Sequence, residues 1–364
     1  MLPFLAEHPG NPSGSHGASR TTKTALEAAR EAVAGVVGAD PAEVVFTGSG
    51  SEADNLAVKG AAHSARQRSG ADGVVTSGIE HKAVLAAASR LAAEGFRVTT
   101  AGAGLDGRVD LDAIEAALDD RTAIVSVMLV NNETGIVQPL ADVAALVREH
   151  APNAVLHTDA VQAPQWLDVR EHTAGYDLVA ISGHKFGGPK GVGALIVRAG
   201  VAVAPLIEGG GHERGLRAGT QNVAGIVALA AALTATDAQR AEEANRIAAL
   251  RDELERGLLP SLPGMEVTGD AVRRVPGVLH ASFPGVEAET LLVALDQCGV
   301  YAASGSACSS GAIDPSHVLL AMGMDRERAL SCVRFSLGYA STTDDVELAL
   351  AVVPEAIARL AVVA

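Results

Sequence analysis

Short apolar runs alternate with amphipathic stretches through the first two hundred residues of the chain. The spacing of apolar residues predicts helices over residues 22–37, 51–65 and 82–94. The apolar runs that favour strands are 44–47, 74–77, 96–100, 123–127, 155–158 and 178–182. Continuous apolar runs are typical of strands buried on both faces, as in a parallel sheet. The alternation therefore predicts a doubly wound α/β domain with a mostly parallel sheet.

The pattern changes near residue 221. Residues 221–258 consist almost entirely of helix-forming types and predict a long helix that connects two domains. After it, the expected elements are strands at 278–283, 300–302 and 333–337 and helices at 288–297 and 344–360. We therefore expect an N-terminal arm over residues 1–20, a large domain over 21–240 and a smaller α+β C-terminal domain over 241–364.

Composition narrows the class of protein. With 364 residues, 48% hydrophobic and 20% charged, the chain is typical of a globular protein rather than a disordered one. Its net charge of −15 argues against non-specific nucleic-acid binding, which needs a basic surface. Three cysteines cannot build a disulfide framework, and no long apolar run or basic leader is present. We expect a cytoplasmic protein that does not bind membranes or nucleic acids.

Lys185 is the most distinctive of the five lysines. It follows an apolar strand and lies in the Gly-rich turn of SGHKFGGPKG. Ligands of α/β sheets gather at the carboxyl ends of strands, where a desolvated lysine amine becomes nucleophilic and can form a Schiff base. The alternative is a surface lysine or one that binds phosphate.

Asp159 ends the apolar run of AVLHTDAVQ and favours the Schiff-base interpretation. A pyridoxal phosphate (PLP) enzyme needs a lysine for the cofactor aldehyde and an acid that keeps the ring nitrogen protonated. The turn TGSGSEADN, between an expected strand and helix, offers backbone N–H groups to a phosphate. The alternatives are an aspartate that caps a helix and an ordinary loop.

Cysteine and arginine provide two further candidates. Cys308 lies among small residues in SGSACSSG, where a thiol is accessible and can act as a nucleophile. Cys298 follows an apolar helix and Cys332 precedes the last strand, so we expect both to be buried and inert. Arg334 begins that strand and can hold a carboxylate through two hydrogen bonds, although a surface ion pair is nearly as good an interpretation.

Taken together, the motifs resemble the cysteine desulfurases, PLP-dependent enzymes of the class V aminotransferase family. The resemblance extends from GNPSGSH near the N-terminus to VRFSLGYASTT near the C-terminus. It rests on FTGSGSEADN, EHKAV, NNETG, HTDAVQ, SGHKFGGPKG, GGGHERGLRAGTQN and SGSACSSG, which follow one another in the family's order. It implies a PLP-dependent transferase fold of type I, with the catalytic cysteine in the small C-terminal domain.

The resemblance also implies roles for individual residues. Lys185 would bind PLP, Asp159 would face the pyridine nitrogen, Gln162 the phenolic oxygen, and His81 would stack on the ring. The phosphate would be held by Gly50, Ser51, Ser182 and His184, and by Thr220 of a second copy in a homodimer. Asn132, Arg334 and Asn11 would lie near the substrate carboxylate and cofactor. Cys308 would carry the persulfide and is also a possible transient iron–sulfur ligand, while no other metal ligand is expected.

The implied reaction removes sulfur from L-cysteine, leaving L-alanine and a persulfide on Cys308. Lys185 would take the Cα proton, and the persulfide would pass to an acceptor or scaffold protein of iron–sulfur cluster assembly or thiolation. The alternatives are a selenocysteine lyase, another member of the superfamily, or a weakly active paralogue that serves as a scaffold. Two features depart from the family pattern: Gly50 and Ser51 replace Ala-Thr, and the chain starts nine residues before Gly10 without an LDxAATTP segment, so the arm is expected to be short.

Overall fold

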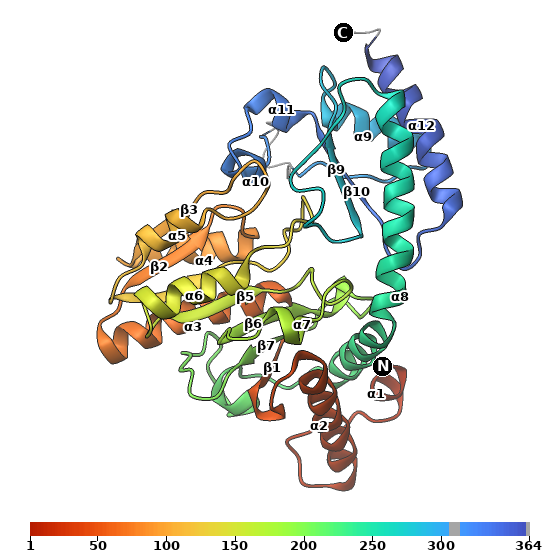
Figure 1. Ribbon diagram of the computed structural model, residues 1–364. Coiled ribbons are helices and arrows are strands. Elements are labelled where there is room, and N and C mark those ends of the chain that lie inside the picture. Colours follow the sequence, from red (N-terminus) through yellow and green to blue (C-terminus); the bar gives the residue numbers. More distant parts are fainter. Residues whose placement is uncertain (306–313, 362–364) are drawn as a thin grey trace. The chain divides into compact units, whose positions relative to one another are not determined.

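The structure, a computed structural model, describes residues 1–305 and 314–361 (Figure 1). These residues form two compact units, which we describe separately. The first unit comprises Met1–Ala101, Leu111–Val130 and Pro139–Arg240. The second comprises Gly102–Asp110, Asn131–Gln138 and the residues from Ala241 onward. Two short segments from the first half of the chain therefore belong to the C-terminal unit.

A seven-stranded sheet forms the centre of the first unit. Its strands are β1 (Val44–Thr47), β2 (Gly73–Ser77), β3 (Arg97–Ala101), β4 (Thr122–Ser126), β5 (Val155–Asp159), β6 (Leu178–Ser182) and β7 (Gly193–Val197). The spatial order is β1-β7-β6-β5-β4-β2-β3, and only β7 runs antiparallel to its neighbours β1 and β6. The predicted mostly parallel sheet and all six predicted strands are confirmed; β7 was not predicted.

Helices flank this sheet (Figure 1). The helices of this unit are α1 (Leu2–Ala6), α2 (Gly17–Val37), α3 (Gly50–Ser69), α4 (Lys82–Ala93), α5 (Leu111–Ala117), α6 (Leu140–His150) and α7 (Val169–His172), with short 3-10 turns η1 (Pro41–Glu43), η2 (Gly183–Lys185) and η3 (His212–Gly215). Alanine, valine and leucine from α3 and α4 pack against the strands in one fully buried core. Because most of these side chains are small, the helices approach the sheet closely.

Local signals fix where the central helix α3 begins and ends. The Ser49 side chain accepts a hydrogen bond from Glu52 N and caps the N-terminus. Gly70 ends the helix with φ of +76°, a left-handed conformation that glycine adopts without steric cost. The cap places the first turn of α3 directly after β1, where its free N–H groups are available to a ligand.

The long helix α8 (Val223–Ser261) passes from the first unit into the second, and the predicted helix is confirmed. The second unit has an antiparallel sheet of β8 (Glu266–Val267), β9 (Val278–Ser282) and β10 (Cys332–Ser336). Its other helices are α9 (Ala288–Gln297), α10 (His317–Ala321), α11 (Arg326–Leu330) and α12 (Thr343–Ala361). The predicted strand at 300–302 is wrong, because only Ala303 forms an isolated bridge, to Arg334.

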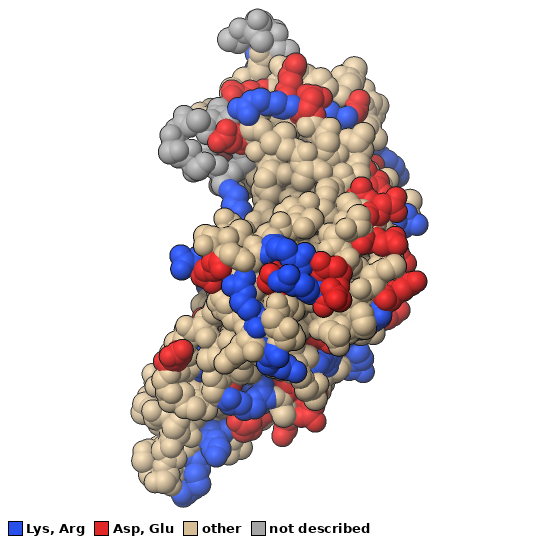
Figure 2. Space-filling model, turned by 90° about the vertical axis from the view of Figure 1, so that its left-hand side faces the viewer, with Lys and Arg blue, Asp and Glu red and all other residues tan. Residues whose placement is uncertain are grey.

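Charged side chains of both signs are intermixed on the face shown in Figure 2. In the first unit, Arg97 pairs with Asp72 and Asp119, and Arg121 pairs with Asp72. These exposed pairs contribute little to stability but neutralise the basic groups locally. Among the described residues, no helix is long and apolar enough to span a membrane.

Gly193 begins β7 at the point where β7 lies between β1 and β6. A Cβ at this position would lie 2.7 Å from the carbonyl carbon of Ser49 and 2.8 Å from the carbonyl oxygen of Ile181. Both are backbone atoms that cannot rotate away. The absence of a side chain here therefore lets the turn before α3 approach the end of β6.

We expect Gly193→Ala to lower the free energy of unfolding by about 1–3 kcal/mol, the usual cost of overpacking. The matched control is Gly35→Ala inside α2, where a Cβ meets no atom within 4 Å. That variant should gain about 0.5–1 kcal/mol from improved helix propensity. Urea denaturation of both variants measures the difference, and equal effects at the two positions would contradict the steric argument.

Candidate active site

The carboxyl ends of six strands meet at one edge of the large sheet. Strands β2, β3, β4, β5 and β6 are parallel, and β1 joins them because β1 and β6 both pair antiparallel with β7. Most of the predicted site residues of the first unit follow these strand ends. Ligand sites of open α/β sheets form at such edges.

Asp159 is the last residue of β5 and is only 5% exposed. Its carboxylate accepts a hydrogen bond from Val161 N at 2.8 Å. Burial raises the pKa of this carboxyl group, while the nearby His81 and Lys185 favour its ionised form. The structure thus brings three of the predicted residues, from three separate motifs, into electrostatic contact.

His81 precedes α4 and lies beside Asp159. Its Nδ1 accepts a hydrogen bond from Ala83 N at 3.1 Å, so a neutral ring carries its proton on Nε2. Donor atoms of His81, Asp159 and Asp54 all lie within 4.8 Å of one another. Two carboxyl groups and an imidazole at this spacing could also hold a metal ion.

The beginning of α3 and the end of β6 lie against each other and form a cradle that could hold an anion. Gly50 N donates a hydrogen bond to Ser182 Oγ at 3.3 Å, and this oxygen lies 3.0 Å from His184 Nδ1. A Cβ on Gly50 would come within 2.8 Å of the Val161 side chain, so only glycine fits without rearrangement. Ser51 and His184 are exposed at this edge. The predicted phosphate residues are therefore adjacent to Lys185.

Three predicted residues lie in less constrained positions. Gln162 is half-buried in the turn after β5, and Thr220 is exposed in the segment between η3 and α8. Asn11 is exposed, and its oxygens accept hydrogen bonds from Ser13 N and Gly14 N of its own turn. The hydrogen bonds described for Asn11 therefore lie within its own turn.

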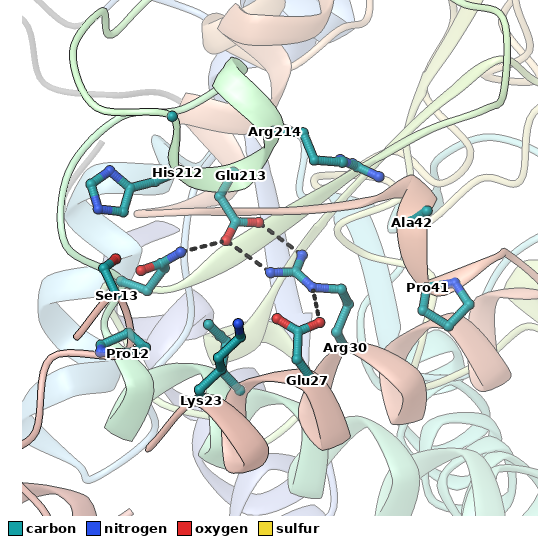
Figure 3. A pocket seen from close by; sticks show the side chains of 13 residues that line it. Pro12, Ser13, Lys23, Glu27, Arg30, Pro41, Ala42, His212, Glu213 and Arg214 are labelled. Carbon is teal, nitrogen blue, oxygen red and sulfur yellow. Dashed lines mark hydrogen bonds and ion pairs between the residues drawn. The ribbon is translucent and has the colours of Figure 1, made fainter. Parts of the chain in front are cut away.

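The segment that carries Thr220 is anchored by a buried ion pair, shown in Figure 3. Arg30 donates to both carboxylate oxygens of Glu213 at 2.9 Å, and Phe46 N also donates to Glu213. Glu213 and Arg214 have φ of +44° and +57°, a left-handed conformation that is unusual for residues other than glycine. A cavity of about 560 Å³ adjoins this pair.

In the second unit, Arg334 and Asn132 come together although 202 residues separate them in the chain. Arg334 Nη1 donates to the carbonyl oxygen of Asn132 at 2.6 Å, and Arg334 pairs through its backbone with Ala303. Burial lowers the pKa of the guanidinium, and Arg334 Nε has no hydrogen-bond partner among the described residues. A partly buried guanidinium with an unused donor is suited to binding a carboxylate.

The three cysteines differ in their surroundings. Cys308 lies outside the described residues. The prediction for Cys298 is wrong, because its position as the C-cap of α9 leaves it exposed. Cys332 is buried as predicted, and burial raises the pKa of its thiol to about 12.

Sequence reasoning missed three buried residues around Asp159. Glu80 is fully buried and accepts hydrogen bonds from Ser77 Oγ and Met128 N, and burial raises its pKa to about 8. Asp54 and His157 complete the group and are 1% and 0% exposed. All three lie in motifs already identified, and sequence spacing could have pointed to two of them. His157 precedes Asp159 by two residues on the same strand face, and Asp54 follows Gly50 by one helical turn.

The donor set fits pyridoxal phosphate better than a metal ion. A metal site gains nothing from the neighbouring lysine, whereas PLP requires a lysine amine, an acid for its ring nitrogen and a phosphate cradle. Lys185, Asp159 and the Gly50–Ser182 cradle supply these groups at one sheet edge. The space that a Cβ on Gly50 would fill is part of that cradle.

Comparisons with known proteins agree with this fit. Residues 1–349 match the family model described as aminotransferase class-V. The chain is 43% identical to a protein named cysteine desulfurase IscS from Clostridium botulinum, covering 98% of this chain and 89% of the relative. It is 40% identical to a cysteine desulfurase from Nostoc, covering 99% and 89%.

Solved structures give the same result. A structure described as a NifS-like protein superposes with a TM-score of 0.91 at 36% identity, covering 99% of this chain and 94% of that chain. DndA from Streptomyces lividans superposes with a TM-score of 0.80 at 39% identity, covering 93% and 94%. The similarity therefore includes both units of the chain.

The buried Glu80 generates a prediction about stability and pH. Its folded pKa of about 8 exceeds the ordinary value of 4.5, so between these values the folded chain holds a proton that the unfolded chain releases. Stability should therefore fall as the pH rises from about 5 to 8, by up to about 1.4 kcal/mol per pH unit. In Glu80→Gln this decrease should be smaller.

Urea denaturation at pH 6 and pH 8 measures this difference. The matched control is Glu31→Gln on the exposed face of α2, which should keep the wild-type pH dependence. An unchanged pH dependence in Glu80→Gln would show that Glu80 does not hold the proton.

Proposed function

The chain belongs to the class V aminotransferase family and is a cysteine desulfurase, and from this premise we propose which of its residues carry out the reaction. The observation that supports the proposal best is the convergence of Lys185, His81 and Asp159 at one sheet edge. This arrangement provides the lysine and the acid that PLP needs. The substrate is L-cysteine and the products are L-alanine and a persulfide.

We assign the cofactor contacts as follows. The Lys185 amine would hold the aldehyde carbon, the Asp159 carboxylate would pair with the ring nitrogen, and the His81 ring would lie against the cofactor ring. Gln162 donates to the phenolic oxygen. Gly50, Ser51, Ser182 and His184 bind the phosphate, as their positions around the first turn of α3 support. When bound, PLP withdraws electrons from the substrate Cα and makes its proton acidic.

The remaining steps belong to side chains of the protein. Arg334, held by Asn132, binds the substrate carboxylate and fixes the orientation of the amino acid. Asn11 is a further candidate near the substrate. The Lys185 amine would accept the Cα proton of the bound substrate as general base. His81 Nε2–H is positioned to donate a proton at the same edge.

Sulfur transfer then takes place at Cys308. Its thiolate attacks the sulfur of L-cysteine, so that the new S–S bond forms as the substrate Cβ–S bond breaks. The electron pair of the broken bond stays with Cβ, which takes up a proton, and Lys185 returns the proton to Cα, so that the product leaves as alanine. The terminal sulfur of the Cys308 persulfide then passes to an acceptor, for which we propose a protein of iron–sulfur cluster assembly or thiolation.

We also propose a homodimer with shared active sites. Thr220 is exposed on the segment anchored by Arg30 and Glu213, and there it is available to the phosphate of a second copy. The strained backbone at Glu213 and Arg214 is consistent with a segment held in a specific shape for contact.

Replacing the nucleophile tests the reaction directly. Cys308→Ala should keep bound cofactor, visible in its absorbance, but release alanine from L-cysteine at less than about 1% of the wild-type rate, because the sulfur has no acceptor. Cys298→Ala is the matched control, since Cys298 is exposed yet has no role in the proposal. A Cys308→Ala enzyme that formed alanine at the normal rate would contradict the assignment.

Replacing the carboxylate-binding residue tests the substrate assignment. Arg334→Gln removes the charge and one of two possible hydrogen bonds, so the KM for L-cysteine should rise at least about tenfold, equivalent to about 1.4 kcal/mol. The fall in kcat should be smaller. Steady-state alanine release measures both, and an unchanged KM would place the carboxylate elsewhere.

A further inference from the structure

Three carboxyl groups lie buried together at the sheet edge, and the proposed mechanism uses only one of them. Asp54 from α3 and Glu80 from the turn before α4 are both close enough to Asp159 to raise one another's pKa. Their exposed fractions are 1% for Asp54, 0% for Glu80 and 5% for Asp159. Burial and the mutual repulsion of three neighbouring carboxylates favour a proton on some of these groups.

The imidazole of His157 adjoins this cluster of carboxyl groups. His157 Nε2 lies 3.7 Å from Asp54 Oδ1, and neither atom has a hydrogen-bond partner among the described residues. On the other side of the ring, His157 Nδ1 lies 2.8 Å from Ser126 Oγ. The chain Ser126–His157–Asp54 therefore leads from β4 through β5 to α3 and reaches Asp159.

Two proton arrangements are compatible with this geometry, and both place one proton between Asp54 and His157. If His157 Nδ1–H donates to Ser126, then Nε2 is an acceptor and Asp54 must be the protonated partner. If Ser126 donates to Nδ1, then Nε2–H faces an ionised Asp54. Although a donor atom of His81 lies within 4.8 Å of Asp54, burial and the neighbouring carboxyl groups raise the pKa of Asp54 and favour the arrangement with a neutral Asp54.

The surroundings of the three acids differ in one decisive respect. Asp159 receives the Val161 N–H and lies near both His81 and Lys185. Asp54 faces Asp159, Glu80 and the neutral ring of His157, whose pKa burial lowers to about 3. Of the three acids, Asp159 is the one whose ionised form His81 and Lys185 favour, whereas burial raises the pKa of Glu80 to about 8 despite its hydrogen bonds from Ser77 Oγ and Met128 N.

We propose that Asp54 and His157 are positioning residues that share one proton behind Asp159, so that the buried cluster carries its negative charge on Asp159. This inference rests on the proposed role of Asp159 toward the ring nitrogen of PLP. A neutral Asp54 leaves the Asp159 carboxylate without a competing buried anion. The shared proton also gives Asp54 a partner other than Asp159, which leaves an oxygen of Asp159 available to the cofactor.

Infrared spectroscopy of the holoenzyme at pH 7 tests the location of the proton. Protonated carboxyl groups absorb in a carbonyl-stretching region in which ionised carboxylates do not. The wild-type spectrum minus that of Asp54→Asn should show one such band, shifted when the sample is exchanged into D₂O. The matched control, Asp112→Asn at an exposed site in the first turn of α5, should show none. If Asp54→Asn loses no band, Asp54 is ionised and the proposal is wrong.

A pH titration tests the positioning role. In His157→Leu the proton on Asp54 loses its acceptor and is donated to Asp159 instead. This change should shift the pH midpoint of the bound cofactor's visible absorbance by on the order of one unit toward lower pH. His157→Gln keeps a polar acceptor and should shift it less. Midpoints equal to wild type in both variants would overturn the proposal, because a purely structural role changes cofactor content but not the midpoint.

One further variant separates this proposal from the function on which it rests. Asp159→Asn should weaken the binding of PLP to the cofactor-free protein at least about tenfold if Asp159 faces the ring nitrogen. Unchanged PLP affinity in Asp159→Asn would overturn the assigned cofactor contacts and the present inference with them. A clear loss of affinity in Asp159→Asn without the infrared band of Asp54 would overturn only the inference.

Discussion

The burial of Asp159 at the end of β5 imposes conditions on every side chain around it. A carboxylate removed from water must be compensated, and the compensation here comes from one backbone N–H and from His81 and Lys185 at neighbouring strand ends. These groups converge because β2, β5 and β6 run in the same direction. The parallel sheet thus supplies the geometry, and the buried charge determines which side chains the geometry must present.

Small residues let backbone segments approach one another at the same edge, where we propose that the phosphate binds. Gly50 and Gly193 each stand where a Cβ would meet other atoms at less than 3 Å. Their absence of side chains allows the turn after β1, the end of β6 and the first turn of α3 to lie against one another. A core made mainly of alanine, valine and leucine has the same consequence, since it brings α3 close to the strands whose ends carry the site.

Much of this arrangement could be predicted from the sequence, because apolar runs identify strands and strand ends identify sites. Lys185 and Asp159 were found in this way, and seven ordered motifs identified the family. Strand β7 was missed because its apolar residues follow a glycine-rich turn. Cys298 was misplaced because an apolar helix precedes it, while its own position at the helix end faces solvent.

The buried partners of Asp159 were harder to predict for a physical reason. Asp54 and Glu80 are ordinary helix and turn residues in the sequence, and their importance arises only when the sheet brings α3, β5 and the turn before α4 together. Sequence periodicity shows on which face of a helix or strand a residue lies. It does not show how close that face comes to a neighbouring helix or strand. Motif resemblance pointed to the residues that we propose to contact a cofactor and left out the buried residues next to them.

Backbone strain at Glu213 and Arg214 also depends on a buried charged group. Glu213 and Arg214 adopt left-handed conformations that cost of order 1–3 kcal/mol each in residues other than glycine. The buried, doubly hydrogen-bonded pair between Arg30 and Glu213 offsets this cost and holds the segment in place. A glycine at either position would relieve the strain, but glycine at position 213 would also remove the carboxylate that anchors the segment. At Glu213 the strain therefore arises because the same residue forms the turn and anchors the segment.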